Sequence, residues 1–243
     1  MRQWTGKRYW LIGASEGLGR AVAEKLSAVG TELVLSARSA DRLNELAESL
    51  PGKASVVTMD ISDNDSVVAA AQEVGEVDGV VFLAGVYWPQ SAREWVADEV
   101  NQMVDINFTG AVRVFGQVVP KMVAKDAGHI VMTGSLSGFR GVPGAIGYGA
   151  SKAGCMSLAE SMYYDLKNTG VDVQCINPGY VRTRLTDKNS ITMPFIMEPE
   201  EAAMHFFDGM NSRRFKKNFP WGFGAFFRST MFMPDWMYYR IFG

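Results

Sequence analysis

Cysteine and histidine are scarce in this sequence of 243 residues. The only cysteines are Cys155 and Cys175, too few for a disulfide framework, and the only histidines are His129 and His205. Because no Cys/His cluster has the spacing of metal ligands, we predict no metal site. We interpret both cysteines as buried thiols and both histidines as structural or solvent-exposed. Unpaired thiols favour a reducing, cytoplasmic location.

An excess of positive charge and long apolar runs are also missing. The 24 basic side chains nearly balance the 26 acidic ones, so the sequence lacks the clustered basic excess that binds nucleic acid. No stretch approaches the roughly 20 apolar residues of a membrane-spanning helix. Met1–Lys7 also lacks the apolar core of a signal peptide. Small molecules are therefore the expected partners.

The remaining composition is that of a globular protein, with 47% apolar and 21% charged residues. Short runs rich in Val, Ile and Leu alternate with helical patterns, which is typical of a parallel sheet with helical crossovers. The expected strands are Tyr9–Ile12, Glu32–Ala37, Ala54–Met59, Gly79–Leu83, His129–Thr133 and Val171–Ile176. We predict an α/β fold: a single-domain, Rossmann-type, doubly wound parallel sheet of about seven strands with helices on both faces.

Helices are expected between these runs. An apolar stripe of helical period covers Leu18–Val29, and a second helix lies between Ser39, its expected cap, and Pro51. Further helices are expected to start at Ser62, to span Trp95–Ala124 and Tyr148–Asn168, and to start at Glu200.

The alternation ends after Asn177, and two unusual segments follow. A loop with three prolines runs about 20 residues, a length typical of functional lids, so residues 180–198 are the expected substrate lid. The tail, residues 219–243, carries ten aromatic side chains. We expect it to form a subunit contact or the floor of a pocket, with peripheral membrane contact as the alternative. No linker divides the chain, so residues 1–243 are expected to form one domain.

A glycine-rich turn, Gly13-Ala14-Ser15-Glu16-Gly17-Leu18-Gly19, follows the first strand and opens a helix. Backbone N–H groups and the positive end of the helix dipole can bind a pyrophosphate there. The spacing Gly-x-x-x-Gly-x-Gly differs from the Gly-x-Gly-x-x-Gly fingerprint of dinucleotide-binding turns. The mechanism of phosphate binding by backbone N–H groups is nevertheless the same. A tight turn without a ligand is the alternative.

The second strand ends in Leu35-Ser36-Ala37-Arg38, with no carboxylate for a ribose 2′-hydroxyl. Arg38 can donate a bidentate pair to a 2′-phosphate. We therefore expect NADP(H) to be preferred and NAD(H) to remain possible. An arginine in a solvated loop is the alternative.

Tyr148 and Lys152 stand four residues apart in a helical pattern, so they share one helix face. A phenol ordinarily ionises near pH 10, and a nearby ammonium favours its ionised form. A tyrosine in this setting can donate a proton to a carbonyl oxygen as hydride arrives. Taken alone, such a pair usually marks only a helix surface.

Further motifs occur in a definite order along the chain. They are the Gly13, Gly17 and Gly19 turn, Asp60-Ile61, Ala84-Gly85, Asn107, Ser135, Tyr148 with Lys152, and Asn177-Pro178-Gly179. With these residues the sequence resembles the short-chain dehydrogenase/reductase family, in its shorter single-domain branch, over roughly residues 7 to 185. Two departures are Ile12 in place of the family's usual Thr and Phe82-Leu83 in place of Asn-Asn. In the family the missing polar side chains connect a loop to the sheet and serve structure. We therefore expect a locally repacked fourth strand and no loss of catalytic chemistry.

The resemblance implies a catalytic set of Asn107, Ser135, Tyr148 and Lys152. Ser135 would hydrogen-bond the substrate oxygen, Lys152 would also hold the nicotinamide ribose, and Asn107 would bend the fourth helix and hold a water of the proton relay. Asp60 and Ile61 would meet the adenine. The implied cofactor contacts are Gly13, Ser15, Glu16, Gly17, Leu18, Gly19, Arg38, Asp60, Ile61, Ala84, Gly85, Tyr148, Lys152, Pro178, Gly179, Val181 and Thr183.

We therefore expect an NADP(H)-dependent oxidoreductase that transfers hydride between nicotinamide and a carbonyl or secondary alcohol, as a homodimer or homotetramer. A non-catalytic dinucleotide-binding sensor is the rival, which the intact catalytic set argues against. A sugar-nucleotide epimerase would generally have a longer chain. The residues expected around the substrate are mostly apolar and favour an apolar molecule: Tyr87, Trp88, Leu136, Phe139 and the lid. An acidic group held by Arg93, Arg140, Arg182 or Arg184 is the alternative.

Overall fold

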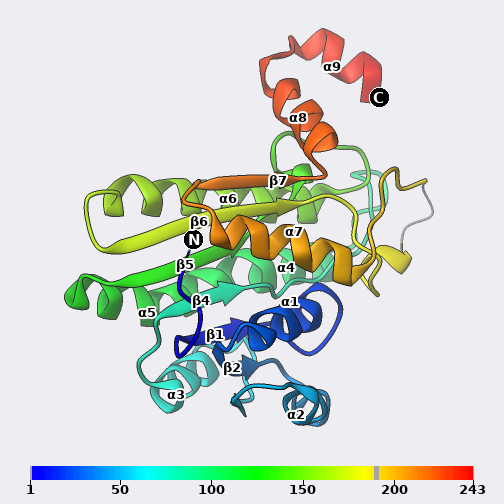
Figure 1. The fold of residues 1–243 in the computed structure, drawn as a ribbon. Coiled ribbons are helices and arrows are strands. Elements are labelled where there is room, and N and C mark those ends of the chain that lie inside the picture. The colour runs from blue at the N-terminus through cyan, green and yellow to red at the C-terminus, as the bar shows by residue number, and fades with distance from the viewer. Residues whose placement is uncertain (1, 189–191, 243) are drawn as a thin grey trace.

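One parallel sheet organises the protein, whose computed structural model describes residues 2–188 and 192–242. The strand order is β3-β2-β1-β4-β5-β6-β7 (Figure 1). The strands are β1 (Arg8–Ile12), β2 (Glu32–Ser36), β3 (Ala54–Val56), β4 (Gly79–Phe82), β5 (Gly128–Thr133), β6 (Val171–Pro178) and β7 (Lys216–Phe219). The order reverses direction between β1 and β4, where ligands bind in open sheets of this kind. The predicted doubly wound, Rossmann-type sheet of about seven strands is confirmed.

Helices cover both faces of the sheet (Figure 1). Helices α1 and α7 pack together on one face, and α3 and α5 pack together on the other. The helices are α1 (Gly17–Ala28), α2 (Ala40–Ser49), α3 (Asn64–Val74), α4 (Ala97–Val104), α5 (Gly110–Lys125), α6 (Ile146–Leu166), α7 (Pro199–Asn211), α8 (Trp221–Ser229) and α9 (Asp235–Phe242).

The strands of the sheet interior are mostly apolar because both of their faces are buried. In β1, Trp10 and Ile12 join the core under α3, α5 and α6, whereas Tyr9 and Leu11 join the core under α1, α2 and α7. Successive side chains of a strand point to opposite faces, so a doubly covered strand reads as a continuous apolar run. At the end of β4, Phe82 is fully buried and its ring centroid lies 6.0 Å from that of Phe115.

The fourth predicted helix is two helices. Between α4 and α5 the chain forms a π-helical turn, Asp105–Thr109, that contains Asn107. A π-helical turn widens the helix locally and is often found at functional sites. The expected single helix over Trp95–Ala124 is therefore wrong in its middle.

One predicted cap, one predicted helix start and one strand also need correction. Ser39 occupies the N-cap of α2, but its side chain makes no capping bond to any residue that the structure describes. Asp63, not Ser62, caps α3, accepting from the Asp65 amide at 2.9 Å. Strand β7 is not among the six strands predicted by position, because its sequence, Lys-Lys-Asn-Phe, is mostly polar.

The isolated cysteines and His129 lie in the core. Cys155, Cys175 and His129 are buried, as expected of structural side chains. His129 Nδ1 pairs with the Tyr9 hydroxyl at 2.8 Å, and its Nε2 pairs with Gln174 Oε1 at 2.8 Å. None of the helices in the described part of the chain has the length and apolar character to cross a membrane.

Candidate active site

A cleft of about 980 Å³ opens where the strands end. Its walls are formed by the segments that follow β1, β2, β3, β4, β5 and β6 and by the first turns of α6. Every predicted cofactor-contact residue lines this cleft, and so does Ser135. Asn107 lies behind the wall and is fully buried. The topology therefore brings motifs from seven separate segments of sequence to one edge of the sheet.

The glycine-rich turn has the geometry of an anion cradle. Gly13 and Gly17 adopt φ angles of 88° and 53°, which favour glycine. A Cβ at Gly19 would lie 2.0 Å from the Gly13 carbonyl oxygen, so the turn closes tightly only with glycine there. Among the described residues, α1 has no side-chain cap and no acid in its first turn. Its first N–H groups can therefore bind an anion.

Glu16, inside this turn, is ion-paired on two sides. Its Oε2 lies 3.0 Å from Arg42 Nη1 on α2, and it also pairs with Arg184 after β6. Thr183 lies against the same turn, because a Cβ at Gly17 would be 2.8 Å from Thr183 Cγ2. The segment after β6 is thus held against the glycine turn across the cleft.

Arg38 and Asp60 mark the end of the cleft beyond β2 and β3. Arg38 is exposed and lines the cleft with Ser39 and Arg42. Burial raises the pKa of Asp60, but hydrogen bonds from Ser62 and the nearby charge of Arg38 outweigh burial and lower its pKa overall. The Asp60 side chain accepts from the Ser62 hydroxyl at 2.6 Å and amide at 2.9 Å. An ionised carboxylate beside a guanidinium is the local electrostatic pattern.

Tyr148 and Lys152 lie one turn apart on α6, and both line the cleft. The Lys152 ammonium is buried and donates to the Thr133 carbonyl at 3.0 Å, at the end of β5. It lies 5.9 Å from the Tyr148 ring centroid. The shared face predicted from their spacing is present, and β5 fixes the position of the charge.

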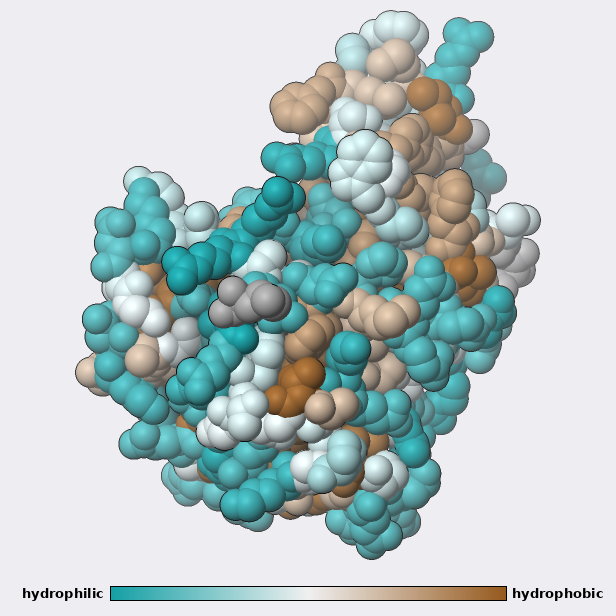
Figure 2. All heavy atoms as spheres, viewed as in Figure 1, coloured by the Kyte–Doolittle hydropathy of each residue, from teal (hydrophilic) through white to brown (hydrophobic). Residues whose placement is uncertain are grey.

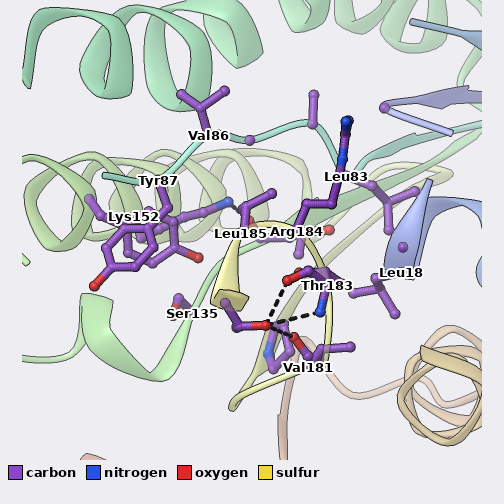
Figure 3. Close-up of a pocket in the computed structure, with 18 of the residues that line it drawn as sticks. Leu18, Leu83, Val86, Tyr87, Ser135, Lys152, Val181, Thr183, Arg184 and Leu185 are labelled. Carbon is purple, nitrogen blue, oxygen red and sulfur yellow. Dashed lines mark hydrogen bonds between the residues drawn. The ribbon is translucent and has the colours of Figure 1, made fainter. Parts of the chain in front are cut away.

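Ser135 follows β5 directly. Its side-chain oxygen accepts from the Ser137 amide at 3.2 Å and lies 2.9 Å from the Ser137 hydroxyl. Figure 3 shows Ser135, Lys152 and Tyr87 towards one end of the cleft, with Leu18 and Thr183 towards the other. The predicted acid/base residues and the glycine turn therefore face one continuous cavity.

Asn107 holds the wall of the cleft from behind. Its Oδ1 accepts from the Val86 amide at 2.7 Å, and its Nδ2 donates to the Val86 carbonyl at 3.0 Å and to Ser151 Oγ at 3.0 Å. The loop after β4, including Ala84-Gly85, is thereby tied to the π-helical turn and to α6.

Aromatic side chains surround the substrate end. The Tyr87 ring stands edge-on to Tyr148 with centroids 4.9 Å apart, and burial raises the pKa of Tyr87 to about 12. From the tail, Phe223, Phe227 and Phe242 reach the cleft. The sequence predicts the aromatic tail as a subunit contact or the floor of a pocket, without placing these three side chains at the substrate end. Phe139, expected here, packs against the core instead.

The expected lid, residues 180–198, folds back on itself. Val181 bridges to Met197, and Thr186 Oγ1 joins the Val181 and Thr183 backbones by the hydrogen bonds drawn in Figure 3. Lys188 Nζ donates to the Tyr87 carbonyl at 3.0 Å and lies 4.3 Å from the Trp88 ring centroid. Residues 189–191 of the expected lid lie outside the described residues. Within the described part, Tyr180, Val181 and residues 183–188 line the cleft.

Most of the arginines considered for an acidic substrate are engaged elsewhere. Arg182 pairs with Glu198 at 2.7 Å, Arg184 with Glu16, and Arg140 with Asp235. Arg93 is exposed and is absent from the described lining of the cleft. The substrate end is therefore predominantly aromatic and aliphatic.

Comparisons with known proteins agree with this geometry. Residues 7–193 match the family model described as short chain dehydrogenase. An oxidoreductase of Myxococcus xanthus is 34% identical over 232 residues, covering 93% of this chain and 92% of the relative. A dehydrogenase/reductase of Burkholderia phymatum in complex with NAD has a TM-score of 0.86 at 25% identity, covering 94% of each chain. A dehydrogenase of Sphingobium yanoikuyae in complex with NADPH has a TM-score of 0.83 at 25% identity, covering 92% of each chain. This chain belongs to the short chain dehydrogenase family of oxidoreductases.

Proposed function

We propose that this protein is an NADP(H)-dependent oxidoreductase that transfers hydride between nicotinamide and a carbonyl or secondary alcohol. The observation that carries the proposal is the position of Lys152. Its buried ammonium, held by the Thr133 carbonyl, lies one helical turn from Tyr148 in the cleft that the glycine turn opens. A charge fixed beside a phenol favours proton transfer through that phenol.

The chain's own residues fit a dinucleotide and its proton chemistry. When bound, the nicotinamide supplies or accepts the hydride. The N–H groups at the start of α1 hold the pyrophosphate, and Ser135 hydrogen-bonds the substrate oxygen. In the reductive direction Tyr148 donates its hydroxyl proton to that oxygen, and Lys152 stabilises the phenolate that remains. Asn107 positions the loop after β4. We also propose that Asn107 holds the water of the proton relay.

The preference for NADP(H) rests on Arg38. Its guanidinium lines the cleft next to Asp60, where the adenosine ribose of a dinucleotide would lie when the pyrophosphate is on α1. A guanidinium can hold a 2′-phosphate bidentately, and no acid follows β2 to repel one. NAD(H) remains a usable but poorer cofactor in this proposal.

An apolar carbonyl or alcohol is the proposed substrate. Tyr87, Trp88, Leu136, Phe223 and Phe227 supply apolar surface at the end of the cleft that holds Tyr148. Arg140, Arg182 and Arg184 are paired with carboxylates, and the Lys188 ammonium donates to the Tyr87 carbonyl, so these cationic groups already have partners within the protein. Transfer of such a substrate from water is driven by burial of its apolar surface.

Replacing Tyr148 with Phe tests the catalytic proposal against a dinucleotide-binding sensor. NADPH consumption is measured across aldehydes, ketones and quinones, and NADPH binding is measured by its fluorescence. We expect Tyr148→Phe to lower turnover by more than about a hundredfold, because general acid catalysis is lost, and to leave NADPH binding unchanged. Tyr87→Phe is the matched control, since Tyr87 adjoins Tyr148 but has no assigned proton transfer. Equal turnover of Tyr148→Phe and wild type would overturn the assignment, and NADPH binding without any turnover in wild type would support the sensor.

We retain the homodimer or homotetramer as a proposal. Val104, Val112 and Val123 on α4 and α5 are exposed apolar side chains that a second copy would cover. Sedimentation velocity tests it: we expect Val112→Asp to shift wild-type oligomers towards the monomer, and a monomeric wild type would contradict it.

A further inference from the structure

The tail presents an unusually apolar surface to solvent. Trp221 and Phe232 are each 84% exposed, and Trp236 is 71% exposed. The other exposed apolar side chains of the tail are Phe226, Met231, Tyr239 and Ile241. In Figure 1, α8 and α9 project beyond β7, and Figure 2 shows tan, white and brown residues gathered over this projection. A concentration of exposed aromatics at one end of a molecule marks an interaction surface.

This surface is held in one orientation. Arg140, after β5, donates to the Thr230 carbonyl at 2.5 Å and the Met233 carbonyl at 2.8 Å. Its guanidinium also lies 4.1 Å from the Tyr238 ring centroid, and the Tyr238 hydroxyl donates to the Gly141 carbonyl at 2.6 Å. The inner side of the tail is therefore packed, and its outer side is a fixed face.

The charge of this region is positive. Between residues 219 and 242 the sequence has two basic side chains, Arg228 and Arg240, and one acidic side chain, Asp235, although the chain as a whole has a net charge of −2. The acidic one, Asp235, is ion-paired with Arg140. Arg228 and Arg240 are exposed among the aromatics. An anionic partner is therefore favoured over a neutral or cationic one.

Helix α9 has the amphipathic pattern of an interfacial helix. Tyr238 is buried and Phe242 faces the cleft. Trp236, Tyr239 and Arg240 are spaced to share the opposite, exposed face. Trp and Tyr concentrate at the boundary between lipid headgroups and acyl chains, and basic residues beside them attract anionic lipids.

An apolar groove lies beside this face and shares the side chain of Phe223 with the cleft. It has a volume of about 390 Å³ and is lined by Phe195, Pro220, Gly222, Phe223 and Phe226. Phe223 lines both the groove and the cleft that contains Tyr148. An apolar chain can therefore stay in contact with aromatic side chains from the exposed face to the cleft.

We propose that the tail seats the protein on an anionic lipid surface and that its substrate is a lipid-resident carbonyl or alcohol whose apolar chain enters past Phe223. The substrate half of this proposal, that the substrate is a lipid-resident carbonyl or alcohol, rests on the proposed function. The binding half, that the tail binds an anionic lipid surface, does not depend on the proposed function. If a second copy of the chain bound to this face, the basic side chains of the two tails would face each other. Repulsion between these like charges disfavours such a dimer.

Vesicle sedimentation tests the binding half with the full-length chain and no substrate. The probes are phosphatidylcholine vesicles and vesicles that also contain phosphatidylglycerol, each at about 0.1 M salt. We expect binding to the anionic vesicles only, with more than about a tenfold loss for the double variant Phe232→Ser and Trp236→Ser, because insertion of the apolar face is lost. The double variant Arg228→Glu and Arg240→Glu should lose binding as well. Tyr164→Ser on α6 is the matched control, since Tyr164 is 69% exposed outside the tail.

The outcomes separate the competing partners. Thermal denaturation of the variants should match wild type, because the changed side chains are exposed. Wild type that fails to bind anionic vesicles overturns the proposal. Wild-type oligomers that dissociate in the Phe232→Ser, Trp236→Ser variant, without vesicle binding, would assign the face to a second copy.

NADPH oxidation by aldehydes of increasing chain length tests the substrate half. With aldehydes presented in anionic vesicles, we expect Phe223→Ala to lower kcat/KM more than about tenfold for long chains and little for short ones, because contact along the groove is lost. An equal effect on both chain lengths would overturn this half. Vesicle binding without any NADPH oxidation would leave the membrane contact standing and contradict the proposed function instead.

Discussion

The Asn107 side chain pairs with both backbone polar groups of Val86, accepting from its amide at 2.7 Å and donating to its carbonyl at 3.0 Å. Asn107 is fully buried in the π-helical turn, and Val86 belongs to the loop that forms one wall of the cleft. This two-bond pairing imitates the pairing of a neighbouring strand and holds the loop where β4 has already ended. The site therefore depends on a residue that does not itself face the cavity.

We expect Asn107→Ala to destabilise the protein and to weaken NADPH binding. The substitution leaves the Val86 amide and carbonyl unpaired, which should cost about 2–3 kcal/mol in the free energy of unfolding. Denaturant titration measures this loss, and NADPH fluorescence measures binding. Ser151→Ala is the control, because it keeps the pairing with Val86 and removes the bonds of Ser151 Oγ to Asn107 Nδ2 and to the Tyr148 carbonyl. If both variants lost the same stability, the pairing with Val86 would not be the important contact.

Gly19 and Gly116 should respond in opposite directions to alanine. At Gly19 the added Cβ would meet the Gly13 carbonyl oxygen at 2.0 Å, so the glycine turn must open. We expect Gly19→Ala to lower stability by about 1–3 kcal/mol and to abolish most NADPH binding. At Gly116 in α5 a Cβ meets no described atom within 4 Å, so Gly116→Ala should be neutral or stabilise the helix by up to about 1 kcal/mol. Unchanged NADPH affinity in Gly19→Ala would count against the anion cradle.

Replacing Arg38 should change cofactor preference rather than turnover. Arg38→Ala removes a charged hydrogen-bond donor to the 2′-phosphate, which is worth about 1.5–3 kcal/mol, or roughly tenfold to a hundredfold in kcat/KM with NADPH. The value with NADH should stay nearly unchanged. Arg20→Ala is the control, since Arg20 pairs with Glu24 and Glu45 on the outer side of α1 and α2. A parallel fall with both cofactors would refute the role of Arg38.

His129 should make the protein less stable in acid. Burial, with a smaller effect of the Arg2 charge, lowers the pKa of His129 to about 3 in the folded protein. The unfolded chain takes up this proton near pH 6.5, so stability falls as the pH drops from about 6.5 towards about 3. Thermal denaturation across this range should show a shallower slope for His129→Gln than for wild type. A wild-type slope in His129→Gln would contradict the prediction.

Local patterns predicted most of the fold. The strands of the sheet interior were recognisable because burial on both faces requires continuous apolar residues, as in β1 and β6. β7 escaped recognition because it is an edge strand of mostly polar residues that pairs with β6 only in the folded chain. The π-helical turn at Asp105–Thr109 could not be read from the local pattern, since its sequence continues a helical pattern, and only the family resemblance implied a bend at Asn107.

The sequence by itself determined the glycine turn, the Tyr148–Lys152 spacing and the positions that line the cleft, because each depends on residues close together in the chain and on strand ends meeting at one edge. Only the tertiary structure decided which distant groups pair. Arg140 holds the tail, Glu16 joins Arg42 to Arg184, and Asn107 holds Val86. These contacts join residues from 21 to 168 positions apart, and the free energy of such pairs depends on burial and geometry that no local pattern encodes.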